Sequence, residues 1–113
     1  MKTNKLTTLV YDINTTLAIY STNYIKRTIG DSTNNNRTVT VRQLIRFLYS
    51  QGYFSVASKV EAVYNQVRTD IGYDRFVTNN RSDAIDINEF VNYLTTVSTT
   101  TARTLGKVIT KAA

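Results

Sequence analysis

The chain has 113 residues, which is enough for one hydrophobic core and too few for two ordinary domains. It carries 14 Lys plus Arg against 8 Asp plus Glu, and this formal charge of +6 favours anionic partners. His and Cys are absent, which excludes imidazole bases, thiol nucleophiles and the usual ligands of zinc. The composition therefore predicts a basic module that is not an enzyme and holds no cofactor.

The first third of the chain predicts one long helix over residues 5–29. Its apolar residues recur at steps of three and four, the period of one helical face: Leu6, Leu9, Val10, Ile13, Leu17, Tyr20 and Tyr24. Gly30 follows, and glycine best tolerates the left-handed turn that ends a helix. Residues 31–37 are short and polar, which favours a loop.

A second helix is predicted to begin after Thr40. Thr40 and Gln43 have the spacing of a capping box, and Val39 and Leu44 that of a hydrophobic staple. Gly52 is the expected stop. The residues expected to face the core are Leu44, Ile45, Phe47 and Leu48.

A third helix is predicted from a cap at Ser55 to about Ile71, before Gly72. Its buried stripe would be Val56, Val60, Val63, Val67 and Ile71. After a polar loop, Asp86 and Glu89 form a second capping box, with Ile85 and Phe90 as the staple. The fourth helix would turn Phe90, Val91 and Leu94 inward.

The last residues, 99–113, form a basic, Thr-rich extension to a helical domain of residues 1–98. The extension could prolong the fourth helix, form a separate short helix or be flexible. Helical spacing continues through Val97, Thr101, Leu105 and Val108.

The second and fourth helix starts align at an offset of 46 residues, from Thr40 to Asp86. This similarity indicates an internal repeat of residues 9–52 and 55–98, or the shared demands of any two capped amphipathic helices. The predicted fold is all-α: four main helices, as two tandem helix-loop-helix hairpins, pack into one small bundle. Short extended contacts are expected at Val39 and Ile85.

Residues 84–90 (AIDINEF) resemble the exit half of an EF-hand loop, where an apolar residue, an acidic cap and a Glu ligand recur. The upstream ligand positions do not fit the family. The second loop carries Thr78, Asn80 and Ser82 there, with Asp83 where glycine is needed, and the first loop carries Ser32, Asn34, Asn36 and Arg37. The sequence therefore predicts no calcium site and no other metal site.

Two groups of basic residues are spaced to lie on helix faces and are the candidates for binding a polyanion. They are Arg37, Arg42, Arg46, Arg103, Lys107 and Lys111. The alternative is that they serve solvation and, near the C-terminus, the helix dipole. Aromatic residues next to the Gly52 and Gly72 turns are candidates for partner binding, or for plugging the ends of the bundle. They are Tyr49, Tyr53, Phe54, Tyr73 and Phe76.

The sequence thus predicts a small binding module that contacts nucleic acid or another polyanion without sequence specificity. The alternative is a protein–protein or assembly component, such as a small viral or phage structural or accessory protein, that binds a partner or itself. No catalytic residue is assigned. Because residues 1–12 lack a signal-peptide pattern and no apolar run is long enough to span a membrane, we expect an intracellular or virion-associated protein.

Overall fold

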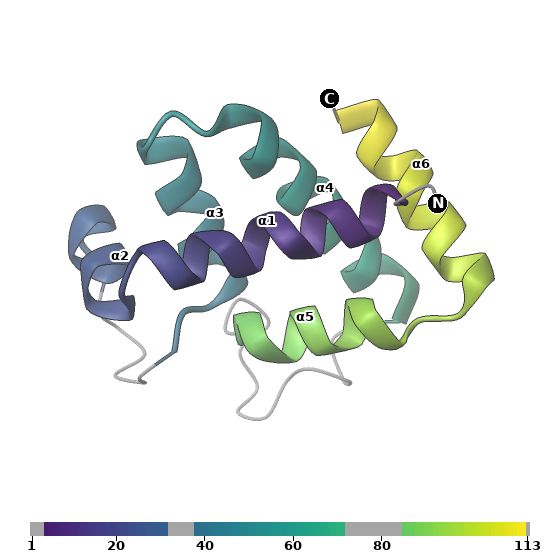
Figure 1. Ribbon diagram of the computed structural model, residues 1–113, viewed down its shortest axis with the longest axis horizontal. Helices are drawn as coiled ribbons and strands as arrows, with labels where there is room; N and C mark the ends of the chain where they lie inside the picture. Colours follow the sequence, from purple (N-terminus) through teal and green to yellow (C-terminus); the bar gives the residue numbers. More distant parts are fainter. Residues whose placement is uncertain (1–3, 32–37, 72–84, 113) are drawn as a thin grey trace.

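The computed structural model describes residues 4–31, 38–71 and 85–112, without the side chains of Asp70 and Ile71 (Figure 1). Several sequence predictions fall outside these ranges. They concern the site residues Arg37, Tyr73 and Phe76, the helix stop at Gly72, and the loop positions 32–37 and 78–83 compared with the EF-hand.

Six helices form in the described part of the chain. They are α1 (Lys5–Ile19), α2 (Thr22–Ile29), α3 (Val41–Ser50), α4 (Phe54–Ile71), α5 (Ile87–Thr96) and α6 (Thr99–Ala112). The all-α prediction is confirmed, whereas the prediction of four main helices in two hairpins needs correction. Within the described ranges, none of these helices has both the length and the apolar character needed to cross a bilayer.

The first correction is a corner within the predicted helix 5–29. Tyr20 has extended backbone, with φ −111° and ψ 128°, and Ser21 begins a new helix by accepting a hydrogen bond from the Tyr24 amide at 3.1 Å. Serine competes with the helical backbone for hydrogen bonds and favours such caps. As a result, Tyr24 leaves the predicted buried stripe and is 43% exposed.

The predicted start of α3 is confirmed in both of its hydrogen bonds. The Gln43 amide donates to the Thr40 hydroxyl at 3.1 Å, and the Thr40 amide donates to the Gln43 side chain at 3.0 Å. At α5, Asp86 accepts from the amides of Asn88 and Glu89, at 2.8 and 3.2 Å. Within the described residues the Glu89 carboxylate does not accept a hydrogen bond from the Asp86 amide. Only half of the second capping box therefore forms.

The residues before α3 and α5 pair across the molecule as a single antiparallel bridge between Thr40 and Asp86. The Val41 amide donates to the Ile85 carbonyl at 2.8 Å, and the Ile87 amide donates to the Val39 carbonyl at 2.9 Å. The two donor residues, Val41 and Ile87, lie 46 positions apart, and so do the two acceptor residues, Val39 and Ile85. This is the same offset that relates the two helix starts in the sequence. The expected extended contacts at Val39 and Ile85 are therefore present, and they join the α2–α3 unit to the α4–α5 unit.

The predicted helix stops at Gly30 and Gly52 are confirmed, with φ of 67° and 85°. After each glycine the next amide reaches back to the helix: Asp31 to the Lys26 carbonyl at 3.0 Å, and Tyr53 to the Leu48 carbonyl at 2.9 Å. Since this turn at Gly52 is tight, α4 begins at once at Phe54. The prediction of Ser55 as its cap is wrong, because Ser55 already lies inside the helix.

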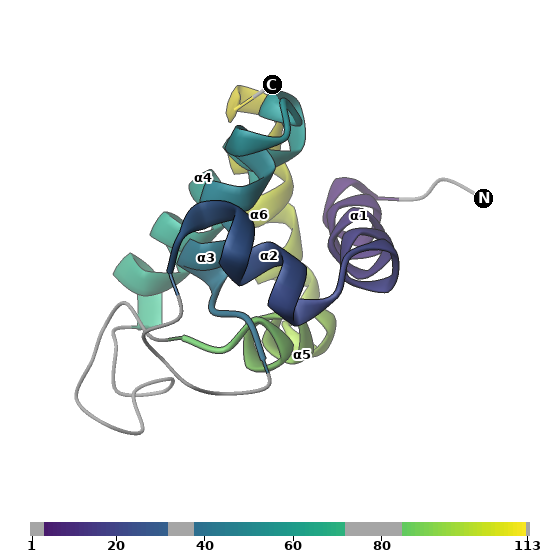
Figure 2. The same cartoon turned by 90° about the vertical axis from the view of Figure 1, so that its left-hand side faces the viewer.

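The C-terminal segment forms a helix of its own. Its chain turns at Val97, and the Ser98 hydroxyl accepts a hydrogen bond from the Thr101 amide at 3.2 Å. Leu105 and Ile109 are buried in the common core, and α6 packs against α4 and α1. In Figure 1, α1 crosses the front of the bundle from α6 to α2, and Figure 2 shows α1 standing to one side of the other helices.

Candidate anion-binding groove

The structure divides the described basic candidates between two helices. Arg42 and Arg46 lie on α3, which packs against α2 and α4, whereas the remaining three lie on α6, which packs against α4 and α1. These three are Arg103, Lys107 and Lys111, and all five side chains are exposed. The five described members of the sequence-predicted set are therefore divided between two helices that share α4 as a neighbour.

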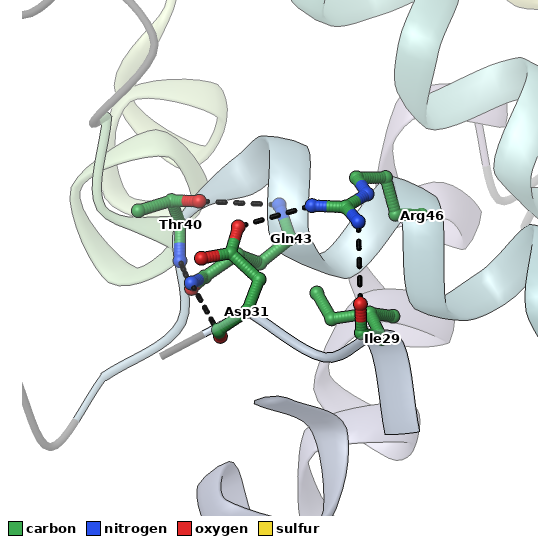
Figure 3. A network of polar contacts seen from close by, with 5 residues as sticks. All are labelled: Ile29, Asp31, Thr40, Gln43 and Arg46. Carbon is green, nitrogen blue, oxygen red and sulfur yellow. Dashed lines mark hydrogen bonds and ion pairs between the residues drawn. The ribbon is translucent and has the colours of Figure 1, made fainter. Parts of the chain in front are cut away.

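Arg46 acts as a structural tie (Figure 3). One terminal guanidinium nitrogen donates to the Asp31 carboxylate at 3.0 Å, and the other donates to the Ile29 carbonyl at 3.2 Å. The Asp31 backbone carbonyl in turn accepts a hydrogen bond from the side-chain amide nitrogen of Gln43 at 3.3 Å. These bonds hold the end of α2 against α3. The positive charge of Arg46 is therefore already paired with Asp31 within the fold.

A groove lies between the start of α1 and the exposed face of α6. It has a volume of about 620 Å³, within the range of about 300–1,000 Å³ that is usual for ligand sites. Its lining residues are Asn4, Lys5, Thr99, Ala102, Arg103, Gly106, Lys107 and Thr110. The groove is thus lined by residues from both α1 and α6, which pack against each other (Figure 1).

Three cations border this groove, and none of its described lining residues carries a carboxylate. Lys5, Arg103 and Lys107 are exposed, and within the described part of the chain no hydrogen bond or ion pair engages their charged groups. Like charges held near one another without counter-ions in the protein attract anions from solution. The charges that border the groove are therefore of the sign that attracts an anion.

Two of the residues that line the groove are small, Ala102 and Gly106. If Gly106 carried a Cβ, no atom of another described residue outside the local helix backbone would lie within 4 Å of it. A glycine inside a helix lowers stability by about 1 kcal/mol relative to alanine, and here its backbone needs no positive φ. The effect of the glycine is to leave open space at this position in the groove.

Sequence reasoning identified Arg103 and Lys107 and missed Lys5 and Gly106. The four-residue spacing on one predicted helix carried the signal for the first two. Lys5 joins them only through the packing of α1 on α6, which no local pattern reports. A glycine interrupting an otherwise helical pattern was an available signal for Gly106.

A second surface feature, the aromatic cluster, lies at the opposite end of α1. It consists of Tyr20, Tyr24, Tyr49, Tyr53 and Phe54. The Tyr20 and Tyr24 rings stack at 5.7 Å, and the hydroxyls of Tyr20 and Tyr53 share a hydrogen bond of 2.9 Å. Tyr49 donates to Glu61 at 2.9 Å and contacts Phe54, with 6.3 Å between ring centroids.

The cluster contains the three described partner candidates, Tyr49, Tyr53 and Phe54. Tyr53 and Phe54 are 45% and 62% exposed, so they do not plug the end of the bundle as fully buried side chains would. The hydrogen bond with Tyr53 and partial burial raise the pKa of Tyr20 above its ordinary value. The Tyr20 hydroxyl therefore stays protonated throughout the neutral range.

The described residues bring no three His, Cys, Asp or Glu side chains together in a group able to hold a metal ion. Asp86, the acidic cap of the EF-hand-like segment, is occupied in capping α5.

Comparison with known proteins returned no match to a protein-family model, a curated protein sequence or a solved structure. A function is therefore inferred from the chemistry of the groove and of the aromatic cluster.

Proposed function

We propose that this chain is a small non-enzymatic module that binds the phosphate backbone of nucleic acid in the groove between α1 and α6, without reading base sequence. The observation that carries the proposal is the meeting of Lys5, Arg103 and Lys107 around one groove, exposed and without partners among the described residues. Such cations bind phosphates by direct attraction and by releasing the condensed counter-ions.

The arrangement favours a polymeric anion over a single small one. Along α6 the cations follow each other at one helical turn, about 6 Å, from Arg103 to Lys107 and on to Lys111. A line of positive charge complements a line of phosphates. Lys111 continues this line beyond the groove lining.

Apart from its cations, the lining offers few side chains for reading bases. Asn4 is its one amide side chain, and the Asn4 oxygen already accepts the Thr7 amide at 2.7 Å to cap α1. Sequence readout needs free donors and acceptors aimed at base edges. Binding in the groove is therefore expected to be independent of sequence.

A second candidate function, a protein–protein or assembly component, is favoured by the aromatic cluster. Exposed Tyr and Phe side chains that touch one another are typical of the centres of protein interfaces. The cluster lies away from the groove, so this function would use a different surface.

The test is a fluorescence-anisotropy titration with short nucleic acids at about 50 and about 200 mM salt. The groove variant Arg103→Ala/Lys107→Ala is compared with Arg27→Ala/Arg42→Ala, which removes the same charge from exposed sites on α2 and α3. The proposal predicts that the groove variant reduces the slope of log K against log salt by about 1.4 for a single strand. The control variant should leave this slope unchanged.

Two results would contradict the proposal. In one, wild-type protein fails to bind at the lower salt; in the other, the two double variants weaken binding equally, as a diffuse charge effect would. The aromatic cluster would then be tested by measuring self-association with the Phe54→Ser variant.

A further inference from the structure

The hydroxyl groups of Tyr20 and Tyr53 meet in the aromatic cluster, and we propose that this pair is a modification site at which a one-electron oxidant joins the two rings as dityrosine. The two oxygens lie 2.9 Å apart, although the residues are 33 positions apart in the chain. A bond between the rings would fasten the corner between α1 and α2 to the turn between α3 and α4. The proposal is independent of the proposed function, because it uses no residue of the groove.

The contact between the hydroxyls places the reactive edges of the two rings next to each other. A tyrosine that has lost one electron and its hydroxyl proton is a phenoxyl radical, whose unpaired electron is shared by the oxygen and by the ortho and para carbons of the ring. The para carbon already carries Cβ, so two such radicals couple through ortho carbons, the Cε atoms. Each Cε is two bonds from its hydroxyl oxygen, and the hydroxyls of Tyr20 and Tyr53 are in contact.

The pair is open to an oxidant on one side and held in place on the other. Tyr53 is 45% exposed, whereas Tyr20 is half-buried and packs edge-on against Phe47, with 4.9 Å between the ring centroids. An oxidant can therefore reach Tyr53 from solvent, while the Tyr20 ring is kept beside it. Reacting groups that the fold holds together couple faster than groups that must meet by diffusion. Coupling within one chain is thus favoured over coupling between chains.

The reaction balances with hydrogen peroxide as the oxidant and a haem peroxidase as its catalyst. Each of the two phenols loses one electron and one proton, and the peroxide takes up both electrons and both protons to become two molecules of water. One carbon–carbon bond forms between the rings, and the hydrogen on each bonded carbon moves to oxygen, which restores two phenols. The chain contains no Cys, so a disulfide cannot supply a cross-link of this kind.

Tyr24 is the competing partner of Tyr20 and provides the matched control. Its exposed fraction, 43%, is close to that of Tyr53. Its ring lies nearly parallel to the Tyr20 ring, at 13° and with 5.7 Å between the centroids, so this contact is made through the ring faces. A link between Tyr20 and Tyr24 would stay within the corner between α1 and α2.

The test treats dilute wild-type protein, Tyr53→Phe and Tyr24→Phe with a haem peroxidase and hydrogen peroxide. Each substitution removes one hydroxyl oxygen, and circular dichroism shows that each variant is folded. Dityrosine fluorescence of the monomer band measures the yield, and mass spectrometry after trypsin locates the link. Since trypsin cuts after Lys5, Lys26, Arg46 and Lys59, the expected product is residues 6–26 joined to residues 47–59 through Tyr20 and Tyr53.

Wild type and Tyr24→Phe are expected to give this product in similar yield, and Tyr53→Phe should give at least about tenfold less dityrosine in the monomer. Because the link closes a loop of 33 residues, the cross-linked monomer should melt about 10 °C or more above the untreated protein. The proposal would be overturned by a link that persists in Tyr53→Phe and disappears in Tyr24→Phe. Wild-type protein that forms dityrosine only between chains, or forms none, would overturn it as well.

Discussion

The two ends of α1 carry the two most distinctive surfaces of the molecule, and they are built in opposite ways. At one end the aromatic cluster is tied into the fold: Tyr20 and Tyr24 both pack edge-on against the buried ring of Phe47, with centroids 4.9 and 6.0 Å away. At the other end the groove is lined by cations that have no partner among the described residues, and by Gly106. Aromatic packing stabilises a fold, whereas clustered like charges and a glycine inside a helix do not. The groove is therefore the one of these two surfaces whose composition adds nothing to stability, and the proposed function gives that composition a reason.

The largest effect is expected from Phe47→Ala, beneath the aromatic cluster. Phe47 is 0% exposed and supports two rings of the cluster. Its truncation should lower the free energy of unfolding by about 3–5 kcal/mol, measured by urea denaturation. A loss below about 1 kcal/mol would mean that the cluster does not depend on this ring.

The local parts of the fold were predictable from sequence because their causes are local. The capping box at Thr40 and the stops at Gly30 and Gly52 each involve residues only a few positions apart. The corner at Ser21 was missed because Leu17, Tyr20 and Tyr24 keep the helical spacing across it. Periodicity alone does not register a break of this kind.

The candidate site was only partly predictable for a related reason. Arg103 and Lys107 share a helix face, so their spacing identified them, but Lys5 reaches the groove from the other end of the chain. Arg46 has the same kind of spacing, yet Asp31 and Ile29 engage it. Whether a basic residue is free or engaged depends on tertiary contacts.

A smaller effect on the free energy of unfolding, of opposite sign, is expected from Gly106→Ala in the lining of the groove. Alanine favours the helix, and its methyl group would meet open space. The free energy of unfolding should rise by about 0.5–1 kcal/mol, while the affinity for nucleic acid should fall if this lining residue contacts it. Thermal melting and anisotropy on the same sample measure both. A loss of stability would show that the glycine serves the fold, which would weaken the contrast between the two ends of α1.

Next in size is the effect on stability of Arg103→Ala/Lys107→Ala. Both side chains are exposed and have no partner among the described residues. Their removal should change the free energy of unfolding by less than about 0.5 kcal/mol, measured by the same urea denaturation at low salt. A larger loss would mean that these side chains hold α6 in place, and any change in binding would then have a structural origin.

The smallest effect concerns pH at the aromatic cluster. Because the hydrogen bond with Tyr53 raises the pKa of Tyr20 in the folded state, the folded chain keeps this proton at a pH where the unfolded chain begins to lose it. The stabilisation is therefore complete below about pH 10, the ordinary tyrosine value, and is lost as pH rises through the raised pKa. Unfolding midpoints of wild type and Tyr20→Phe should converge above that pH. Parallel curves would contradict this account.

The most direct test of the central claim is an NMR titration of the isotope-labelled chain with a single-stranded oligonucleotide, which follows every backbone amide. The account predicts that the amides shifting most are those of the groove, above all Lys5, Arg103, Gly106 and Lys107, and that those of Tyr20, Tyr24 and Tyr53 stay in place. Shifts centred on the aromatic cluster, with the groove unmoved, would contradict it.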